Sequence, residues 1–187
     1  MTLKNACVPV TIPFDRSYWV TPGRFLAGYY PGDRQREMIK KKMASLLACG
    51  IRCIINLMEP DEQDHNGFPF VDYVPVLKKI TDRGSPVACH RMPIRDLGIP
   101  SRDFMVKILD RIDGALKENR PVYVHCWGGR GRTGTVVGCW LARHSIAEGE
   151  SALEKIKELR RTDAKAHWPS PEMSEQIRMV LSWKKGE

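Results

Sequence analysis

One stretch, residues 121–135, places a cysteine and an arginine where they could act together on a phosphate group. It reads Pro-Val-Tyr-Val-His-Cys-Trp-Gly-Gly-Arg-Gly-Arg-Thr-Gly-Thr, so an apolar run delivers Cys126 into a glycine-rich loop and Arg132 follows six positions later. A thiolate is a nucleophile, successive loop N–H groups can form an anion nest, and a guanidinium pairs with two phosphate oxygens. The spacing predicts a site where sulfur attacks the phosphorus of a bound monoester.

The neighbouring residues have supporting roles in this hypothesis. We expect the backbone N–H groups of the loop, together with the Arg132 side chain, to bind the phosphate. A buried His125 would donate hydrogen bonds that keep the loop in shape, and a helix over 132–144 would favour the thiolate through its dipole. The hydroxyl of Thr133 would donate to the sulfur and ease its departure in a second step. The expected backbone donors are Trp127, Gly128, Gly129, Arg130 and Gly131.

The Cys-(x)5-Arg loop, with His125 before it and Thr133 after it, resembles the signature of the cysteine-dependent protein tyrosine phosphatase superfamily. Its Gly-Gly pair is most similar to the compact dual-specificity phosphatases of the kinase-associated type. The resemblance implies a two-step hydrolysis through a phosphocysteine intermediate. Arginine and backbone amides would stabilise the charge in such a site, so we expect neither a metal nor another cofactor.

The same resemblance implies an aspartate general acid on a loop about thirty residues upstream of the cysteine. Asp96 lies 30 residues before Cys126, in the segment Pro93-Ile94-Arg95-Asp96. It would protonate the leaving oxygen and then accept a proton from water. Gln176, after Ser170-Pro171-Glu172, resembles a late glutamine that helps to place this water.

Other functions remain open for the same residues. Arg130 is an extra cation inside the loop, and it could hold a second phosphate of a phosphoinositide or inositol phosphate. A catalytically inactive module that binds phosphoproteins is an alternative of another class. The glycines at 129, 131 and 134 also match a dinucleotide-binding fingerprint, but too few residues follow for the rest of such a domain. The P-loop of nucleotide hydrolases is excluded because the required lysine is missing.

The composition limits the class of protein. With 187 residues, 42% of them hydrophobic and 28% charged, the chain suits one globular domain. It lacks the apolar run of a membrane span or a signal peptide, so we expect a cytoplasmic protein. Its six cysteines form no CxxC pair, which argues against structural zinc. The net charge of +8 comes from short basic runs separated by acids, which favours a phosphorylated protein, peptide or inositol phosphate over nucleic acid. The oligomeric state is left open.

The order of apolar patterns predicts an α/β fold: a central mixed sheet of about five strands with helices on both faces, as in the dual-specificity phosphatases. We expect an N-terminal arm over 1–19 and a single phosphatase domain over 20–187. Ser101 should cap the helix that follows it. The predicted strands are 24–27, 52–57, 71–76, 88–93 and 121–125. The predicted helices are 33–48, 101–117, 132–144, 150–161 and 171–183.

The predicted activity is hydrolysis of phosphotyrosine, as well as phosphoserine and phosphothreonine, in proteins.

Overall fold

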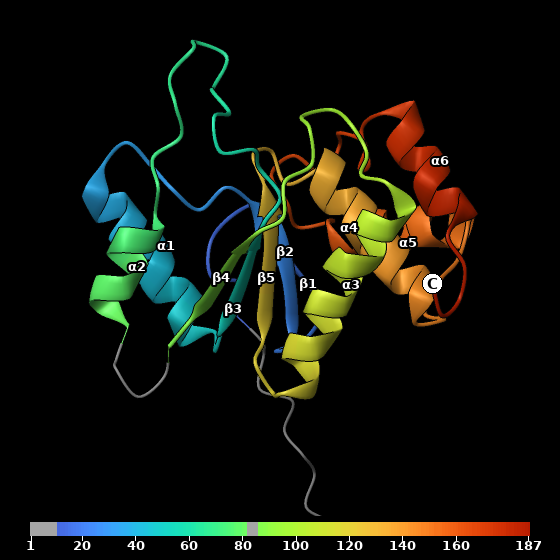
Figure 1. The fold of residues 1–187 in the computed structure, drawn as a ribbon, viewed down its shortest axis with the longest axis horizontal. Helices are drawn as coiled ribbons and strands as arrows, with labels where there is room; N and C mark the ends of the chain where they lie inside the picture. The colour runs from blue at the N-terminus through green and yellow to red at the C-terminus, as the bar shows by residue number, and fades with distance from the viewer. Residues whose placement is uncertain (1–10, 82–85) are drawn as a thin grey trace, which may run out of the picture.

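A five-stranded sheet forms the centre of the molecule in the computed structural model, which describes residues 11–81 and 86–187 (Figure 1). The strands lie in the order β1-β2-β5-β3-β4. Only β1 runs antiparallel to its neighbour, and the other pairs are parallel. The predicted mixed α/β sheet is therefore confirmed. The strands are β1 (Ser17–Thr21), β2 (Phe25–Tyr29), β3 (Cys53–Asn56), β4 (Ala88–Arg91) and β5 (Val122–Cys126).

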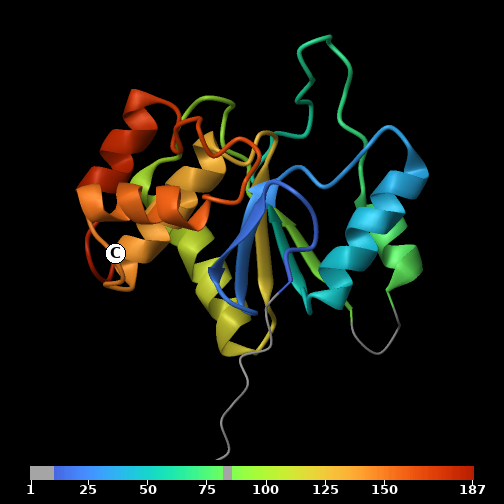
Figure 2. The same cartoon turned by 180° about the vertical axis from the view of Figure 1, so that it is seen from behind.

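Helices cover both faces of the sheet, and Figure 2 shows the same layers from behind. α1 and α2 pack on one face, while α3 to α6 lie on the other. Side chains alternate along β5, so Tyr123 faces the first layer while Val122 and Val124 face the second. Both faces are buried, which explains why β5 reads as a continuous apolar run. The helices are α1 (Arg36–Ala48), α2 (Val74–Ile80), α3 (Arg102–Lys117), α4 (Gly131–Arg143), α5 (Glu150–Leu159) and α6 (Ser174–Ser182).

The topology brings three loops together at the end of the sheet where β3, β4 and β5 have their carboxyl ends. β3, β4 and β5 are parallel neighbours, so the loops after their carboxyl ends meet there. The loop after β5 leads into α4, which is buried from Gly131 to Ala142 between the sheet and the other helices. In open α/β sheets, ligands bind at this edge.

Two predictions about local structure were wrong. The segment 71–76 is not a strand, because α2 begins at Val74. Pro75 lies in its first turn, where proline favours a helix, and Tyr73, Val76 and Leu77 are buried at helical spacing. No strand was predicted before residue 24, whereas β1 begins at Ser17 and spans the boundary expected after residue 19.

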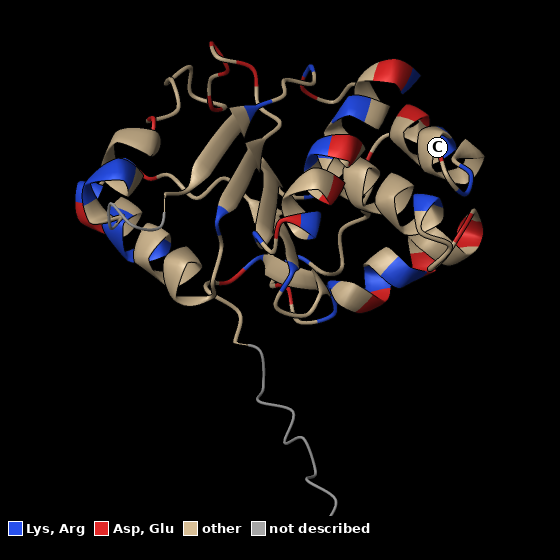
Figure 3. Ribbon diagram, turned by 60° about the horizontal axis from the view of Figure 1, so that its bottom comes forward, with Lys and Arg blue, Asp and Glu red and all other residues tan. Residues whose placement is uncertain are grey.

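The other elements agree with the sequence patterns to within a few residues. Ser101 caps α3 as expected, since its side chain accepts a hydrogen bond from the N–H of Phe104. The predicted starts at 33 and 171 are three residues too early. Lys and Arg lie mainly on the helices and loops, with Asp and Glu between them (Figure 3). Within residues 11–81 and 86–187, no helix has the length and apolarity needed to cross a bilayer.

Candidate active site

The thiol of Cys126 lies at the bottom of a cavity at the carboxyl edge of the sheet. Cys126 is the last residue of β5 and is only 2% exposed, yet it lines this cavity of about 360 Å³. The hydroxyl of Thr133 donates to its Sγ at 3.1 Å. A substrate atom can therefore reach the sulfur only through the cavity, and a donor is already in place to stabilise negative charge on it.

The loop 126–131 is held open by donors outside it. Four of its carbonyls each accept a hydrogen bond from a residue outside the loop. The N–H groups of 127–130 meet no protein acceptor within the described ranges, which leaves them for an anion. The outer donors are the ring of His125 to Cys126 O, the N–H of Tyr30 to Trp127 O, Arg16 Nη2 to Gly128 O and Ser170 Oγ to Arg130 O.

Gly129 is the residue that lets this loop turn. Its φ is +71°, a conformation that disfavours side chains, and an added Cβ would lie 2.7 Å from the backbone of Gly28 and Tyr29. With glycine at position 129, the loop therefore approaches β2 more closely than it could with any other residue at that position.

His125 supports the loop from the opposite face of the sheet. Its ring is fully buried, and burial lowers the pKa of His125 to about 3, so the imidazole is neutral. Nδ1 lies 3.3 Å from the carbonyl oxygen of Cys126, and the Tyr73 hydroxyl lies 2.7 Å from Nε2. Since a carbonyl only accepts, we assign the proton to Nδ1, and Tyr73 then donates to Nε2.

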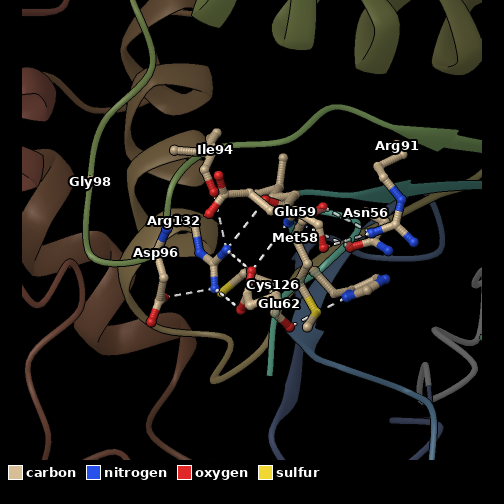
Figure 4. Close-up of polar contacts among 12 residues, drawn as sticks. Asn56, Met58, Glu59, Glu62, Arg91, Ile94, Asp96, Gly98, Cys126 and Arg132 are labelled. Carbon is tan, nitrogen blue, oxygen red and sulfur yellow. Dashed lines mark hydrogen bonds and ion pairs between the residues drawn. The ribbon is translucent and has the colours of Figure 1, made fainter. Parts of the chain in front are cut away.

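Arg132 is buried and surrounded by oxygen atoms (Figure 4). Its Nη1 and Nη2 lie 2.6 and 2.7 Å from the two carboxylate oxygens of Glu62. Nη1 also donates to the carbonyl of Ile94 at 3.1 Å, and Nη2 lies 2.8 Å from Oδ1 of Asp96. Burial alone would lower the pKa of Arg132, but the bonds to Glu62 and the charges of Cys126 and Asp96 raise it above the ordinary value.

Glu62 is the site residue that the sequence analysis missed. It lies in the loop between β3 and α2, and its side chain is only 7% exposed. This loop packs on the cysteine loop through aromatic contacts, with the rings of His65 and Phe70 centred 4.4 and 5.3 Å from Trp127. A run of acidic residues after β3 could have pointed to Glu62. β3 lies next to β5 in the sheet, so the loop after β3 lies near the cysteine loop.

Asp96 lies on the loop between β4 and α3 and faces both Arg132 and the cavity. Gln176, at the start of α6, is fully buried and lines the same cavity. Its Nε2 donates to the carbonyl of Gly98 at 3.0 Å, so it ties α6 to the Asp96 loop. The structure thus brings Asp96 and Gln176 together with Cys126 and Arg132, although these residues are spread over 81 positions.

The lining of the cavity includes aromatic as well as charged side chains. Trp127 and His65, whose rings lie 4.4 Å apart, line it together with Trp168 from the segment between α5 and α6. The guanidinium of Arg130 lies 4.5 Å from the centre of the Trp168 ring and pairs with Glu172 at 3.0 Å. The cavity can therefore take a phosphate at its floor and a planar group against an aromatic side chain of its wall.

Sequence comparisons point to one family. A family model described as "Swiss Army Knife protein, DSP-PTPase phosphatase domain" matches residues 15–179. An uncharacterized protein of Methanocaldococcus jannaschii is 39% identical over 67 residues, 36% of this chain and 44% of that protein. Human cyclin-dependent kinase inhibitor 3 is 28% identical over 131 residues, 69% of this chain and 58% of that protein. The chain spans about half the length of these curated relatives.

Solved structures with low sequence identity share the fold. Kinase associated phosphatase, with its catalytic-site cysteine replaced by serine, gives a TM-score of 0.68 at 19% identity, covering 89% of this chain and 91% of that one. Pseudomonas aeruginosa TpbA in complex with phosphotyrosine gives 0.65 at 15%, covering 97% and 93%. PTPMT1 in complex with PI(5)P gives 0.63 at 18%, covering 89% and 93%.

Proposed function

Because the chain belongs to the DSP-PTPase phosphatase domain family, whose members are cysteine-dependent phosphatases, we propose that it hydrolyses phosphotyrosine in proteins and accepts phosphoserine and phosphothreonine more slowly. One observation carries the proposal. Cys126 and Arg132, from one loop, and Asp96, from another, line one cavity together with Trp127 and Trp168. A reducing compartment would keep the thiol available, so we place the activity in the cytoplasm.

In the first step, the phosphate would bind the N–H groups of 127–130 and one edge of Arg132. Glu62 occupies the Nη1/Nη2 edge of the guanidinium, which leaves the Nε/Nη2 edge for the ligand. The phosphate then replaces Asp96 at Nη2. The Cys126 thiolate attacks phosphorus, so that an S–P bond forms while the bond to the leaving oxygen breaks. Protonated Asp96 gives its proton to that oxygen.

In the second step, water hydrolyses the phosphocysteine. Asp96, now a carboxylate, accepts a proton from the water as the new O–P bond forms and the S–P bond breaks. The electron pair returns to sulfur, where the Thr133 hydroxyl at 3.1 Å stabilises it. Gln176 would help to place the water from its position in the cavity wall.

The aromatic walls favour an aryl phosphate. Trp127 offers an apolar face to the ring of a phosphotyrosine, whereas a serine or threonine side chain would leave it uncovered. The structural neighbour TpbA, solved with phosphotyrosine, supports this choice.

A phosphoinositide or inositol phosphate is the second candidate substrate. It is favoured by Arg130 in the cavity wall and by the structural neighbour PTPMT1, which was solved with PI(5)P. Against it, Glu172 lies 3.0 Å from Arg130 and places a negative charge where a second phosphate would bind. This pairing is why we place phosphotyrosine first.

The proposal is tested with Cys126→Ser against Cys89→Ser, which alters a thiol on β4 away from the cavity. We expect Cys126→Ser to lose turnover of p-nitrophenyl phosphate and phosphotyrosine peptides while still binding vanadate, and Cys89→Ser to keep wild-type turnover. Turnover by Cys126→Ser at the wild-type rate would refute the nucleophile. Wild-type turnover of inositol phosphates without turnover of phosphotyrosine peptides would refute the substrate class. Binding of phosphopeptides without any thiol-dependent turnover would indicate an inactive binding module.

A further inference from the structure

A buried ion pair shapes the segment between α5 and α6. Arg160 and Asp163 are 3.2 Å apart, with side chains only 2% and 4% exposed. Arg160 Nη2 donates to the carbonyl of Lys165 and Nη1 to that of Trp168, both at 3.1 Å. Oδ1 of Asp163 accepts from the N–H of Lys165 at 2.8 Å. The pair thus fixes the backbone at Lys165 and at Trp168.

These two fixed residues carry side chains that line the active-site cavity. Trp168 is one of its aromatic walls, about half exposed and covered on one face by the guanidinium of Arg130. Lys165 is exposed, and its Nζ lies 5.7 Å from the centre of the Trp168 ring. A charged tip next to an apolar platform is suited to a side chain that has an apolar stem and a negative end.

Lys165 differs from the other cations of the cavity because its ammonium group is not paired with a carboxylate or a carbonyl in the described part of the chain. Across the part of the chain that the structure describes, no carboxylate lies within ion-pair distance of Lys165. Any anion that enters the cavity mouth therefore meets this charge without displacing a partner. The other three cations are each engaged, Arg132 with Glu62, Arg130 with Glu172 and Arg16 with the carbonyl of Gly128.

We propose that Lys165 and Trp168 form a recognition site for an acidic residue next to the phosphorylated residue of a protein substrate, a role that rests on the proposed phosphatase activity. The phosphate binds at the cavity floor, and the neighbouring acid pairs with Lys165 while its methylene groups lie on Trp168. An ion pair at an exposed site contributes about 0.2–1 kcal/mol, which corresponds to a preference of up to about fivefold in kcat/KM.

The test compares phosphotyrosine peptides that differ by one residue. Glutamate or glutamine is placed at each of the three positions before and after the phosphotyrosine, and the Glu:Gln ratio of kcat/KM is measured for each position. We expect a wild-type ratio of about three to five at one or two positions, decreasing as salt is added. Lys165→Gln should bring the ratio to about one, and Lys165→Glu should bring it below one.

Lys157→Gln is the matched control, since Lys157 is an exposed lysine on α5 that does not line this cavity. It should keep the wild-type ratio. A ratio of one at every position in the wild type would overturn the inference, as would a ratio that Lys165→Gln leaves unchanged. Failure of the proposed function has a different signature, because no phosphopeptide would then be turned over.

Discussion

Glu62 and Arg132 form a two-point ion pair between residues 70 positions apart, with distances of 2.6 and 2.7 Å and almost no solvent contact. The carboxylate occupies the end of the guanidinium, and the carbonyl of Ile94 accepts a further bond from Nη1 at 3.1 Å. These contacts fix the plane of Arg132 before any ligand arrives. Preorganised charge is the main source of transition-state stabilisation in phosphoryl transfer.

Replacing Glu62 by glutamine should therefore weaken catalysis even though Glu62 does not need to touch the substrate. The amide accepts one bond from Arg132 but presents an N–H to the other nitrogen, so the guanidinium turns away. We expect kcat/KM for p-nitrophenyl phosphate to fall about tenfold to a hundredfold, equivalent to about 1.4–2.7 kcal/mol. The affinity for vanadate should fall in parallel.

Two measurements separate this role from simple unfolding. Removing one partner of a buried pair costs about 3–5 kcal/mol, so activity is compared at a temperature at which circular dichroism shows both proteins folded. Asp61→Asn alters an exposed neighbouring acid outside this ion pair and should retain more activity. A rise in kcat/KM for Glu62→Gln would show that the carboxylate competes with phosphate instead of orienting the clamp.

Asp96→Asn should slow hydrolysis most for substrates with poor leaving groups. An amide cannot donate the proton that an alkoxide or phenoxide needs, and general acid catalysis contributes about 10²–10⁴-fold. A series of aryl phosphates with leaving groups of increasing basicity measures the effect. The slope of log(kcat/KM) against basicity should be steeper in the variant, while Asp103→Asn, on α3, should keep the wild-type slope. An equal loss for all leaving groups would contradict the assignment of Asp96 as the acid.

The sequence predicts the parts of the site that are local in the chain. The strand, loop and helix around Cys126 follow from an apolar run, three glycines and a helical pattern, and Asp96 follows from its spacing to the cysteine. The position of Glu62 depends instead on how its loop folds back, and that is decided by contacts of His65 and Phe70 with Trp127. No periodicity in the sequence encodes such contacts.

The wrong secondary-structure predictions have a similar physical cause. The valines near residue 74 favour a strand by propensity, but burying Tyr73, Val76 and Leu77 against α1 and the sheet requires helical spacing. β1 was missed because, among the strands that the structure describes, it pairs with β2 alone. An edge strand has a weaker apolar pattern than a central strand such as β5.

Thr133→Ala should slow the breakdown of the phosphocysteine more than its formation. The hydroxyl donates to Sγ at 3.1 Å, and a hydrogen bond to a charged group is worth about 1.5–3 kcal/mol, or about tenfold to a hundredfold in rate. A burst of p-nitrophenol followed by a slower steady state should appear in rapid-mixing experiments. Thr133→Ser retains the hydroxyl and should show neither the burst nor the loss. If the alanine variant shows no burst and a normal steady state, the hydroxyl does not assist the leaving sulfur.

His125 should make the stability of the fold depend on pH. Its pKa is about 3 in the fold and 6.5 ordinarily, so below pH 6.5 the unfolded chain binds a proton that the folded chain does not. The free energy of unfolding is therefore not reduced by this group above pH 6.5, and it decreases as the pH falls toward 3. The decrease is about 2 kcal/mol at pH 5. Urea unfolding of the wild type and His125→Gln at pH 7.5 and 5 measures the effect. The wild type should lose about 2 kcal/mol more than the variant between these pH values, whereas His167→Gln, at an exposed position, should behave like the wild type. If His125→Gln shows the full wild-type loss, the imidazole is not held neutral behind the loop.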